Sequence, residues 1–218
     1  MGYNVAIDGP AGAGKSTIAK LVAKEKGYIY VDTGAMYRGM AIHFLDKGIR
    51  AKDTDQIISA LNDAEFTIRY EEGLQQVYLN GRNITDRLRE EEVGKMASLT
   101  SAIPQVRQKL LELQKGLART QDVIMDGRDI GTCVLPDADV KIYLTASVET
   151  RAKRRYDELT EKGIACDLDE IKRDIKERDE RDSTREIAPL KQAEDAVLVD
   201  SSHMTIDEVV AAIVKLCR

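Results

Sequence analysis

Residues 9–16 read Gly-Pro-Ala-Gly-Ala-Gly-Lys-Ser, and this octet fits the G-x-x-x-x-G-K-[ST] pattern of a phosphate-binding P-loop. A short apolar run, Val5-Ala6-Ile7, precedes it as a strand would, and residues 17–26 follow with apolar side chains at helical spacing. A loop that leads from a strand into a helix presents unpaired N–H groups and the positive end of the helix dipole. Both attract phosphate oxygens, so the octet predicts a nucleotide site between a strand and a helix.

Each residue type in the octet has a physical role in holding phosphate. Gly9, Gly12 and Gly14 have no Cβ, which lets the backbone wrap closely around the anion. Lys15 reaches the terminal phosphates, and the Ser16 hydroxyl is a ligand for Mg²⁺. The alternative interpretation is a glycine-rich turn before an ordinary helix. We expect ATP to bind along Gly9, Pro10, Ala11, Gly12, Ala13, Gly14, Lys15, Ser16 and Thr17.

The composition limits the kind of protein. A chain of 218 residues is long enough for one α/β domain with an inserted or appended piece, and 43% hydrophobic with 33% charged residues is usual for a globular protein. A net charge of −5 argues against a nucleic-acid-binding surface, and no apolar run is long enough to span a membrane. The three cysteines are far apart and suggest neither a disulfide framework nor a zinc site. We expect a cytoplasmic protein whose partners are small molecules.

Apolar runs and helical patterns alternate along most of the chain, which is the signature of an α/β fold. Pro104 opens one helix at its first position, and Thr205 with Glu208 forms a capping box for the last helix. We expect five buried strands in a parallel sheet, at residues 5–7, 28–31, 123–125, 140–144 and 197–199.

One segment has a different pattern. Residues 66–70, 76–79 and 82–84 resemble short strands, and Asn80-Gly81, the preferred two-residue hairpin turn, separates the last two. The sequence therefore predicts a small antiparallel insertion over about residues 62–100. A hairpin with no function is the alternative.

Charged residues follow the expected strand at 123–125. Asp126 comes directly after it, so its carboxylate lies at the carboxyl edge of the sheet, where ligands bind in open α/β folds. We expect Asp126 to hold Mg²⁺ through water, as a Walker-B aspartate does. Arg128 and Asp129 add a cation and a second acid at the same edge. A solvated turn is the alternative.

The segment Asp32-Thr33-Gly34-Ala35-Met36-Tyr37-Arg38 lies after the second expected strand, again at the carboxyl edge. Arg38 follows Tyr37 and so points away from the apolar stripe of its helix. We expect it to face a ligand between this loop and the sheet, together with Arg128.

A basic region lies late in the chain. Arg151, Arg154 and Arg155 share one helix face by their i, i+3, i+4 spacing. A second helix begins near Asp167 with apolar residues and continues into alternating Arg and Asp. Surface ion pairs, each contributing little, are one interpretation. The other is a mobile lid whose arginines neutralise the charge of a transferring phosphoryl group and exclude water.

Together, four stretches make the sequence resemble the bacterial cytidylate (CMP) kinases. The stretches at 126–132 and 176–182 are far more specific than the P-loop, and the similarity covers essentially the whole chain. The stretches are Gly9–Thr17, Asp32-Thr33-Gly34-Ala35-Met36-Tyr37-Arg38, Asp126-Gly127-Arg128-Asp129-Ile130-Gly131-Thr132 and Lys176-Glu177-Arg178-Asp179-Glu180-Arg181-Asp182.

This resemblance implies the nucleoside-monophosphate-kinase fold, a P-loop NTPase-type five-stranded parallel sheet flanked by helices. It implies a core at residues 1–61, 101–150 and 186–218. The insertion at about 62–100 would bind the nucleoside monophosphate, and residues of about 151–185 would form the arginine-rich lid.

The resemblance also implies roles for single residues. Arg38 and Arg128 would hold the acceptor phosphate, while Arg154 and Arg155 would lie over the ATP phosphates. Cytosine would be read by Ser98, Arg107 and Asp129 with help from Thr33, and the sugar would contact Arg178, Asp182 and Arg185. The implied catalytic residues are Lys15, Arg128, Arg154, Arg155 and Arg181. Ala11 departs from relatives that carry serine there.

The sequence thus favours ATP-dependent phosphorylation of CMP and dCMP, with Mg²⁺ and without a protein partner, by a monomer. The chemistry fits, because a carboxylate such as Asp129 suits the amino donor of cytosine but not the carbonyl of uracil. A kinase for UMP or AMP and a non-enzymatic GTP- or ATP-binding switch remain as alternatives.

Overall fold

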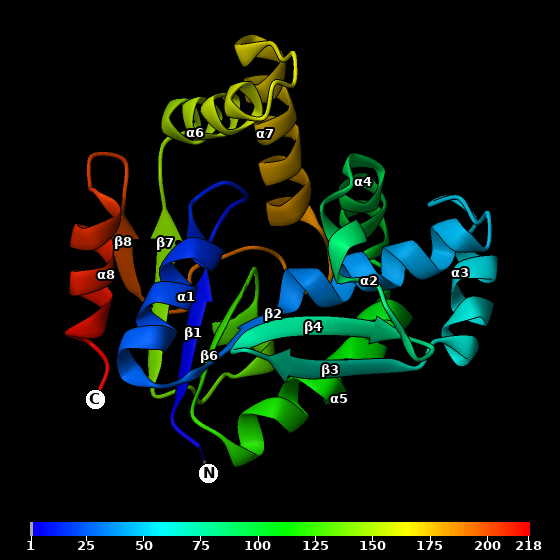
Figure 1. Ribbon diagram of the computed structural model, residues 1–218, viewed down its shortest axis with the longest axis horizontal. Coiled ribbons are helices and arrows are strands. Elements are labelled where there is room, and N and C mark those ends of the chain that lie inside the picture. The colour runs from blue at the N-terminus through cyan, green and yellow to red at the C-terminus, as the bar shows by residue number, and fades with distance from the viewer. Residues whose placement is uncertain (1) are drawn as a thin grey trace. The chain divides into compact units, whose positions relative to one another are not determined.

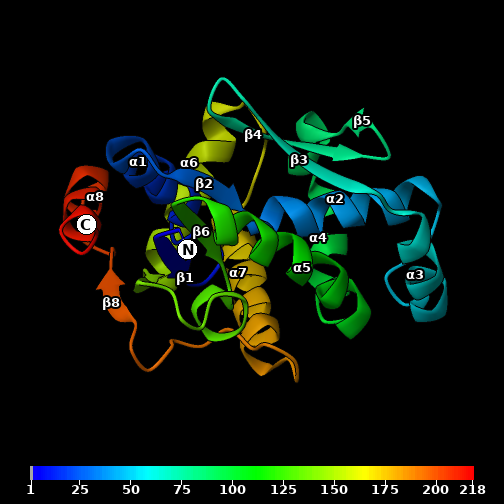
Figure 2. The ribbon, with the colours of Figure 1, turned by 90° about the horizontal axis from the view of Figure 1, so that it is seen from below.

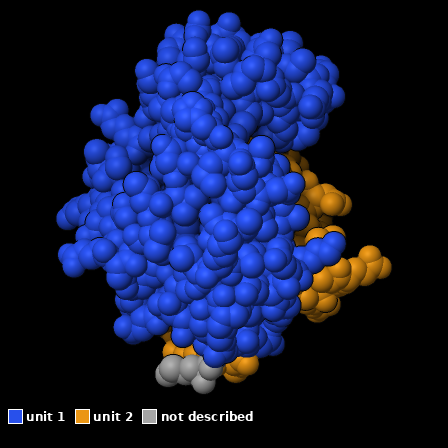
Figure 3. All heavy atoms as spheres, turned by 90° about the vertical axis from the view of Figure 1, so that its left-hand side faces the viewer, with its two compact units in different colours: residues 1–30, 121–218 blue, residues 31–120 orange. Residues whose placement is uncertain are grey.

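Strand β1 (Asn4–Asp8) lies at the centre of a five-stranded sheet and leads directly into the P-loop. The computed structural model describes residues 2–218, and their contacts divide the chain into two units (Figure 3). Unit 1 combines the chain up to Tyr30 with Gln121–Arg218, and unit 2 is Val31–Thr120. Each is described by itself.

The five-stranded sheet has the order β2-β6-β1-β7-β8. Beside β1 lie β6 (Val123–Gly127) and β7 (Val140–Thr145), both parallel to it, with Ile7 opposite Asp126 and opposite Ile142. The outer strands are β2 (Ile29–Asp32) and β8 (Val197–Asp200). Every strand expected from the sequence is present, and the predicted α/β class is confirmed.

One strand does not have the expected burial. The apolar run at 197–199 predicted a buried strand, but β8 lies at the edge of the sheet, where it pairs only with β7 among the described strands. Val197 is 44% and Leu198 is 55% exposed, and only Val199 is buried. The prediction that this strand is buried was therefore wrong for Val197 and Leu198.

Four α-helices belong to unit 1: α1 (Lys15–Lys26), α6 (Val148–Glu161), α7 (Leu168–Thr184) and α8 (Ile206–Val214). Helix α1 ends at Gly27, whose φ of 71° is the left-handed conformation that closes a helix. The capping box of Thr205 and Glu208 at the start of α8 is confirmed. A short π-helical turn, η3 (Ile130–Val134), follows β6.

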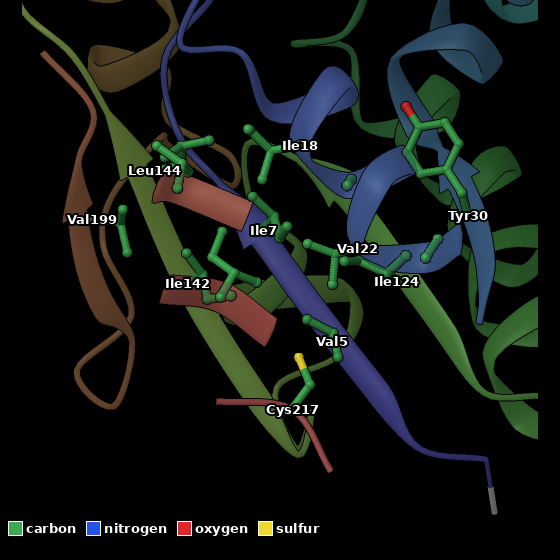
Figure 4. Packing of buried hydrophobic residues seen from close by; sticks show 14 residues of the cluster. Val5, Ile7, Ile18, Val22, Tyr30, Ile124, Ile142, Leu144, Val199 and Cys217 are labelled. Atoms are coloured by element: carbon green, nitrogen blue, oxygen red, sulfur yellow. The ribbon is translucent and has the colours of Figure 1, made fainter. Parts of the chain in front are cut away.

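The main core of unit 1 lies between the sheet and helices α1 and α8. Ile18 and Val22 of α1 pack with Val5 and Ile7 of β1, and Cys217 closes the far end of the cluster (Figure 4). These side chains alternate along the strand and recur every three or four residues along the helix, which brings them to one shared layer. The layer fixes β1 and α1, and therefore the loop between them.

Helices α6 and α7 pack against each other as a pair, crossing at a wide angle (Figure 1), and have a small apolar cluster of their own. Ala152 of α6 packs with Ile171 and Ile175 of α7. The predicted start of α7 is confirmed, because Asp167 is its N-cap and accepts a hydrogen bond from the backbone N–H of Glu170.

Unit 2 combines a small antiparallel sheet with helices. The sheet has the order β3-β4-β5, with strands side by side in Figure 2. Its strands are β3 (Phe66–Glu71), β4 (Leu74–Leu79) and β5 (Arg82–Asn83), and the helices are α2 (Thr33–Asp46), α3 (Thr54–Ala60), α4 (Glu91–Thr100) and α5 (Pro104–Thr120), with 3₁₀ turns η1 (Leu61–Asp63) and η2 (Thr85–Arg89).

The predicted hairpin turn is confirmed. Asn80 and Gly81 have φ values of 49° and 77°, as a two-residue turn of this kind requires, and they join β4 to β5. Glu72 and Gly73, with φ values of 51° and 76°, make the same kind of turn between β3 and β4.

Two segments of unit 2 differ from the expectation. The second half of the predicted antiparallel insertion forms helix α4, whose buried residues Val93, Met96 and Ala97 have helical spacing. Helix α2 begins at Thr33, so most of the segment 32–38, expected as a loop leading into a helix, is already helical. Asp32 is its N-cap, accepting a hydrogen bond from the backbone N–H of Ala35 at 2.8 Å.

Among residues 2–218, no helix combines the length and the apolar character needed to cross a membrane.

Candidate active site

The P-loop has the backbone that the sequence predicts. Gly12 and Gly14 have φ values of 76° and 88°, and Gly14 is the N-cap of α1. A Cβ on Gly9 would lie 1.9 Å from the carbonyl oxygen of Leu144, so only glycine lets β1 and β7 approach this closely. Because Gly12 and Gly14 carry no side chain, nothing from these two residues obstructs the first N–H groups of α1.

Lys15 is buried, with 6% of its surface exposed, and its Nζ donates to the carbonyl oxygen of Pro10 at 2.8 Å. Burial, and after it the positive charge of Arg128, lowers the pKa of Lys15 well below its ordinary value. The carboxylates of Asp126 and Asp8 act in the opposite direction. An added anion beside Lys15 would favour its charged form.

Ser16 and Asp126 meet as the sequence predicts. The Ser16 hydroxyl donates to Oδ2 of Asp126 at 2.9 Å, and the Tyr30 hydroxyl donates to Oδ1 at 2.9 Å. A hydroxyl beside a buried carboxylate is a donor set of oxygen atoms, which suits Mg²⁺. Within the described part of the chain no three His, Cys, Asp or Glu side chains are grouped to hold a metal. The pair therefore fits an ion that takes most of its ligands from phosphate and water.

Asp8, at the end of β1, holds the segment that follows β6. Its two carboxylate oxygens accept the backbone N–H groups of Ile130, at 2.8 Å, and Gly131, at 2.7 Å. Burial is the largest influence on this side chain and raises the pKa of Asp8 to about 6, although the two N–H donors oppose it. Asp8 thus fixes the turn η3 beside Arg128 and Asp129.

Two ion pairs at the same edge involve predicted substrate residues. Arg128 donates from Nε to Oδ2 of Asp182 at 2.9 Å, and Arg185 lies 3.4 Å from Oδ1 of Asp129. Asp182 and Asp129 are both buried, at 5% and 4% exposed. The structure therefore brings four predicted residues of unit 1 together in two pairs.

The arginines of α6 lie in three different environments, although the spacing placed them on one face. Arg151 is buried and contacts the P-loop, with its Nη1 donating to the carbonyl oxygen of Ala11 at 3.0 Å. Arg154 is half-buried and donates to the Ser201 carbonyl oxygen at 2.8 Å. It also lies near Gly14, with Nη1 4.0 Å from the position that a Cβ would have there.

The remaining arginines of this region lie farther out. Arg155 is exposed and pairs with Glu158 on its own helix, at 2.9 Å. On α7, Arg178 is half-buried and Arg181 is exposed. Of the arginines expected in the lid, Arg151 and Arg154 thus lie beside the P-loop, and Arg155 pairs within its own helix.

In unit 2, Arg38 is held near the start of α2. Its Nη2 lies 3.3 Å from Oδ2 of Asp32, the N-cap of the same helix. Its Nε is buried and has no hydrogen-bond partner within the described residues, so this guanidinium has unused donor capacity. Gln75 of β4 fixes Asp32 in turn, accepting from its backbone N–H at 2.9 Å and donating to its carbonyl oxygen at 3.2 Å.

The other predicted residues of unit 2 lie on three helices. Thr33 is buried at the first position of α2, and Ser98 is half-buried near the end of α4. Arg107 of α5 donates to the carbonyl oxygen of Ser101 at 3.4 Å, and its guanidinium lies 5.7 Å from the centre of the Tyr37 ring. The structure thus joins Arg107 to the segment after α4 and to α2.

Three further residues organise the site but were not predicted as site residues. Asp8 could have been found, because the rule that singled out Asp126 at a strand end applies equally to the residue before the P-loop. Arg151 was grouped with Arg154 and Arg155 as either a surface ion-pair face or part of a lid, and neither interpretation predicts a buried residue bonded to the P-loop. Nothing in the sequence around Gln75 indicates its bonds to the backbone of Asp32.

The chain is similar to cytidylate kinases over nearly its whole length. The model of the cytidylate kinase family matches residues 5–218. A cytidylate kinase of Caldicellulosiruptor saccharolyticus is 50% identical over 213 residues, covering 98% of this chain and 94% of the relative. A cytidylate kinase of Lactobacillus johnsonii is 50% identical over 214 residues, covering 98% and 93%.

Among solved structures, an uncharacterized protein from Eubacterium ventriosum has a similar fold. Its TM-score is 0.54 at 14% identity, with 98% of this chain and 96% of that chain covered. At this identity the similarity concerns the fold alone.

Proposed function

This chain belongs to the cytidylate kinase family and phosphorylates CMP, and from that premise we propose which of its residues carry the transfer from ATP and how. The observation that supports the proposal most is the P-loop with buried Lys15, and with Ser16 bonded to Asp126 at 2.9 Å. These are the parts that an ATP-dependent kinase of the P-loop type requires.

The donor nucleotide binds along Gly9–Thr17. The N–H groups at the start of α1 point toward the phosphates, and Lys15 moves from the carbonyl of Pro10 to phosphate oxygens. The burial that lowers the pKa of Lys15 is then offset by the phosphate charge. Lys15 thus acts as a cation on the group being transferred.

Ser16 and Asp126 would hold Mg²⁺, Ser16 through its hydroxyl and Asp126 through water. When bound, the ion neutralises charge on the donor phosphates. Tyr30 keeps the Asp126 carboxylate in place by its own hydrogen bond. Activity that did not depend on a divalent cation would contradict this assignment.

The acceptor is held by residues from both parts of the sequence. Arg38 and Arg128 bind its phosphate, which the unused Nε of Arg38 supports. Ser98, Arg107 and Asp129, with Thr33, read cytosine. The sugar contacts Arg178, Asp182 and Arg185.

The chemistry needs no general base, because the CMP phosphate is largely dianionic near neutral pH, its second pKa being about 6. Catalysis comes from orientation and charge neutralisation, with Lys15, Arg128, Arg154, Arg155 and Arg181 as the cations. Nη1 of Arg154 lies 4.0 Å from the position of a Cβ on Gly14, beside the start of α1. Helices α6 and α7 are the lid, and its closure stops water from acting as acceptor.

We also propose that the protein acts as a monomer in the cytoplasm. Its three cysteines are unpaired, which fits a reducing compartment. Light scattering of the purified protein measures its oligomeric state, and a dimer at working concentration would contradict the first part.

A coupled assay of ADP release with CMP, dCMP, UMP and AMP tests the proposed function. We expect CMP and dCMP to have the highest kcat/KM. UMP has a carbonyl where cytosine has an amino group, so it would leave a buried acceptor unpaired beside Asp129. A higher kcat/KM for UMP or AMP than for CMP would contradict the roles of Ser98, Arg107 and Asp129.

A further inference from the structure

Arg151 is a buried guanidinium for which the proposed mechanism has no use. Only 4% of its surface is exposed, whereas Arg155 on the same helix is exposed. Burying a cation destabilises the folded protein unless its N–H groups have hydrogen-bond acceptors and an anion balances its charge. The partners of Arg151 therefore indicate why a charge is placed there.

These partners come from three separate segments of unit 1. Nε donates to the carbonyl oxygen of Ala146 at 2.9 Å, at the end of β7, and Nη1 donates to the carbonyl oxygen of Ala11 at 3.0 Å, in the P-loop. Nη2 donates to Oδ2 of Asp179 on α7 at 2.6 Å. One side chain thus joins the phosphate loop to the sheet and to both helices of the α6–α7 pair.

The bond to Ala11 determines the direction of the peptide that follows. In a trans peptide the C=O of one residue and the N–H of the next point in opposite directions. Because the Ala11 carbonyl points toward Arg151, the N–H of Gly12 points away from the Arg151 guanidinium. Gly12 has a φ of 76° and, lacking a side chain, it would otherwise have freedom to rotate this peptide.

The side chain of Arg151 also limits the space beside this peptide. A Cβ on Gly12 would lie 3.4 Å from the Cβ of Arg151, so the aliphatic stem lies directly against the loop. The stem thus lies beside Gly12, and the hydrogen bond from Nη1 to the Ala11 carbonyl fixes the orientation of the peptide.

Asp179 supplies the balancing charge. Its Oδ2 binds Arg151, while its Oδ1 is buried with no hydrogen-bond partner among residues 2–218. The carboxylate therefore depends on Arg151, and Arg151 depends on it, so the position of α7 determines where the guanidinium lies.

We propose that Arg151 is a positioning residue for the ATP phosphate site, which turns the Gly12 N–H toward the phosphates, and that Asp179 sets its side chain. This inference rests on the proposed binding of ATP along the P-loop. It assigns to the α6–α7 pair a second role, because the pair acts on donor binding through the buried Arg151 and not only through arginines that close over the phosphates.

Arg151→Lys tests the inference, with Lys153→Ala as the matched control. Lysine keeps the charge but has no planar fork, so it cannot hold Ala146, Ala11 and Asp179 together. Lys153 is on the same helix, is exposed, and contacts only its helix neighbours Asp157 and the ring of Tyr156 among the contacts described. Steady-state kinetics give KM for ATP and for CMP separately, and calorimetry gives the Kd of ADP.

We expect Arg151→Lys to raise KM for ATP and Kd for ADP by about tenfold, the effect of one lost charged hydrogen bond. KM for CMP stays unchanged, and Lys153→Ala changes neither constant. A structural role alone would lower the melting temperature and the active fraction while KM for ATP and Kd for ADP stayed the same. That result, or an equal rise in both KM values, would overturn the proposal.

Asp179→Asn gives a second test that does not alter Arg151. It replaces Arg151→Lys in the same measurements if that variant folds poorly. We expect Asp179→Asn also to raise Kd for ADP. In the Arg151→Lys background it should raise Kd by a much smaller factor than in the unaltered protein, because both changes disturb one network. Full additivity would overturn the link through Arg151. If the unaltered protein did not bind ADP or transfer phosphate to CMP at all, the proposed function would fail instead.

Discussion

Arg128 and Asp182 form a partly buried ion pair, with Nε of Arg128 2.9 Å from Oδ2 of Asp182, and it joins the segment after β6 to helix α7. The side chain of Asp182 is 7% exposed and that of Arg128 is 20% exposed. In the proposed mechanism Arg128 binds the acceptor phosphate and Asp182 the sugar, so each of these residues orients the other.

Asp182→Ala is expected to raise KM for CMP by about tenfold, because it removes a sugar contact and the partner of Arg128. It also lowers the free energy of unfolding by about 2 kcal/mol, as a partly buried cation loses its charged hydrogen bond. Initial rates at varied CMP and at varied ATP measure the two KM values.

Asp169→Ala is the control for that variant, because Asp169 is exposed on the same helix and pairs with Lys172. It should leave both KM values unchanged. An effect of Asp182→Ala on KM for ATP alone would remove Asp182 from the acceptor site.

Lys15→Ala is expected to lower kcat by at least about a hundredfold, since the P-loop lysine acts on charge that develops during transfer. Stability should rise or stay the same, because the variant removes a buried ammonium whose pKa is lowered by desolvation. Single-turnover kinetics and thermal unfolding measure the two effects. Lys24→Ala on the exposed face of α1 serves as the control, and an unchanged turnover in Lys15→Ala would contradict the role of the motif.

Asp8 gives a prediction for the pH dependence of stability. Its pKa is raised from 3.8 to about 6 in the folded protein, so folding favours the protonated carboxyl. The stabilisation is complete below the unfolded value and is lost as pH rises through about 6, a change of roughly 3 kcal/mol in all.

Asp8→Asn removes this titration. Chemical denaturation between pH 4 and pH 7 should show the unaltered protein losing stability relative to the variant as pH rises. A difference between the two proteins that stayed constant over this range would contradict the raised pKa of Asp8.

Two glycines of unit 2 should respond to alanine with opposite signs. A Cβ on Gly39 of α2 would lie 2.4 Å from the Phe66 ring, so Gly39→Ala should destabilise the protein by about 1–3 kcal/mol through overpacking. At Gly116 of α5 nothing lies within 4 Å of the added Cβ, and Gly116→Ala should stabilise the protein by about 0.5–1 kcal/mol. Melting temperatures of the two variants provide the comparison, and a shift in the same direction for both would contradict it.

The sequence predicted the sheet and the P-loop well because both depend on local signals. Short apolar runs determine the strands, and glycines with a lysine determine the loop. Asn80-Gly81 identified one hairpin turn for the same reason. Glu72-Gly73 makes an equal turn, but glutamate carries no preference for a positive φ, so this turn could not be found.

Burial at the edge of the sheet and in α5 was harder to predict. Val197 and Leu198 are as apolar as the central strands, and only the strand order shows that they lie at an edge. In α5 the helical spacing of Val106, Leu110, Leu113 and Leu117 predicts one inward face. Val106 and Leu110 are buried, but farther along the helix Gln114 is buried instead of the two leucines. A polar residue inside a helix does not reveal from its own position which neighbours will cover it.

The chemistry of the site was predictable only in part. Ser16 and Asp126 follow from motif and strand end, and they do meet. The partners of single arginines did not follow, because Arg151, Arg154 and Arg155 have the same local pattern but different surroundings. Helix spacing determines which way a side chain leaves the helix, and only the tertiary fold determines what it meets.

The central position of β1 affects how this protein is made. β1 leaves the ribosome first, but its two neighbours, β6 and β7, are translated only after all of unit 2. During synthesis both edges of β1 therefore remain without a partner strand, and the nascent chain must keep this apolar strand from pairing wrongly. Slowing of the ribosome before β6 and β7 have emerged from it should accordingly prolong a state that chaperones recognise, whereas slowing after both strands have emerged should not.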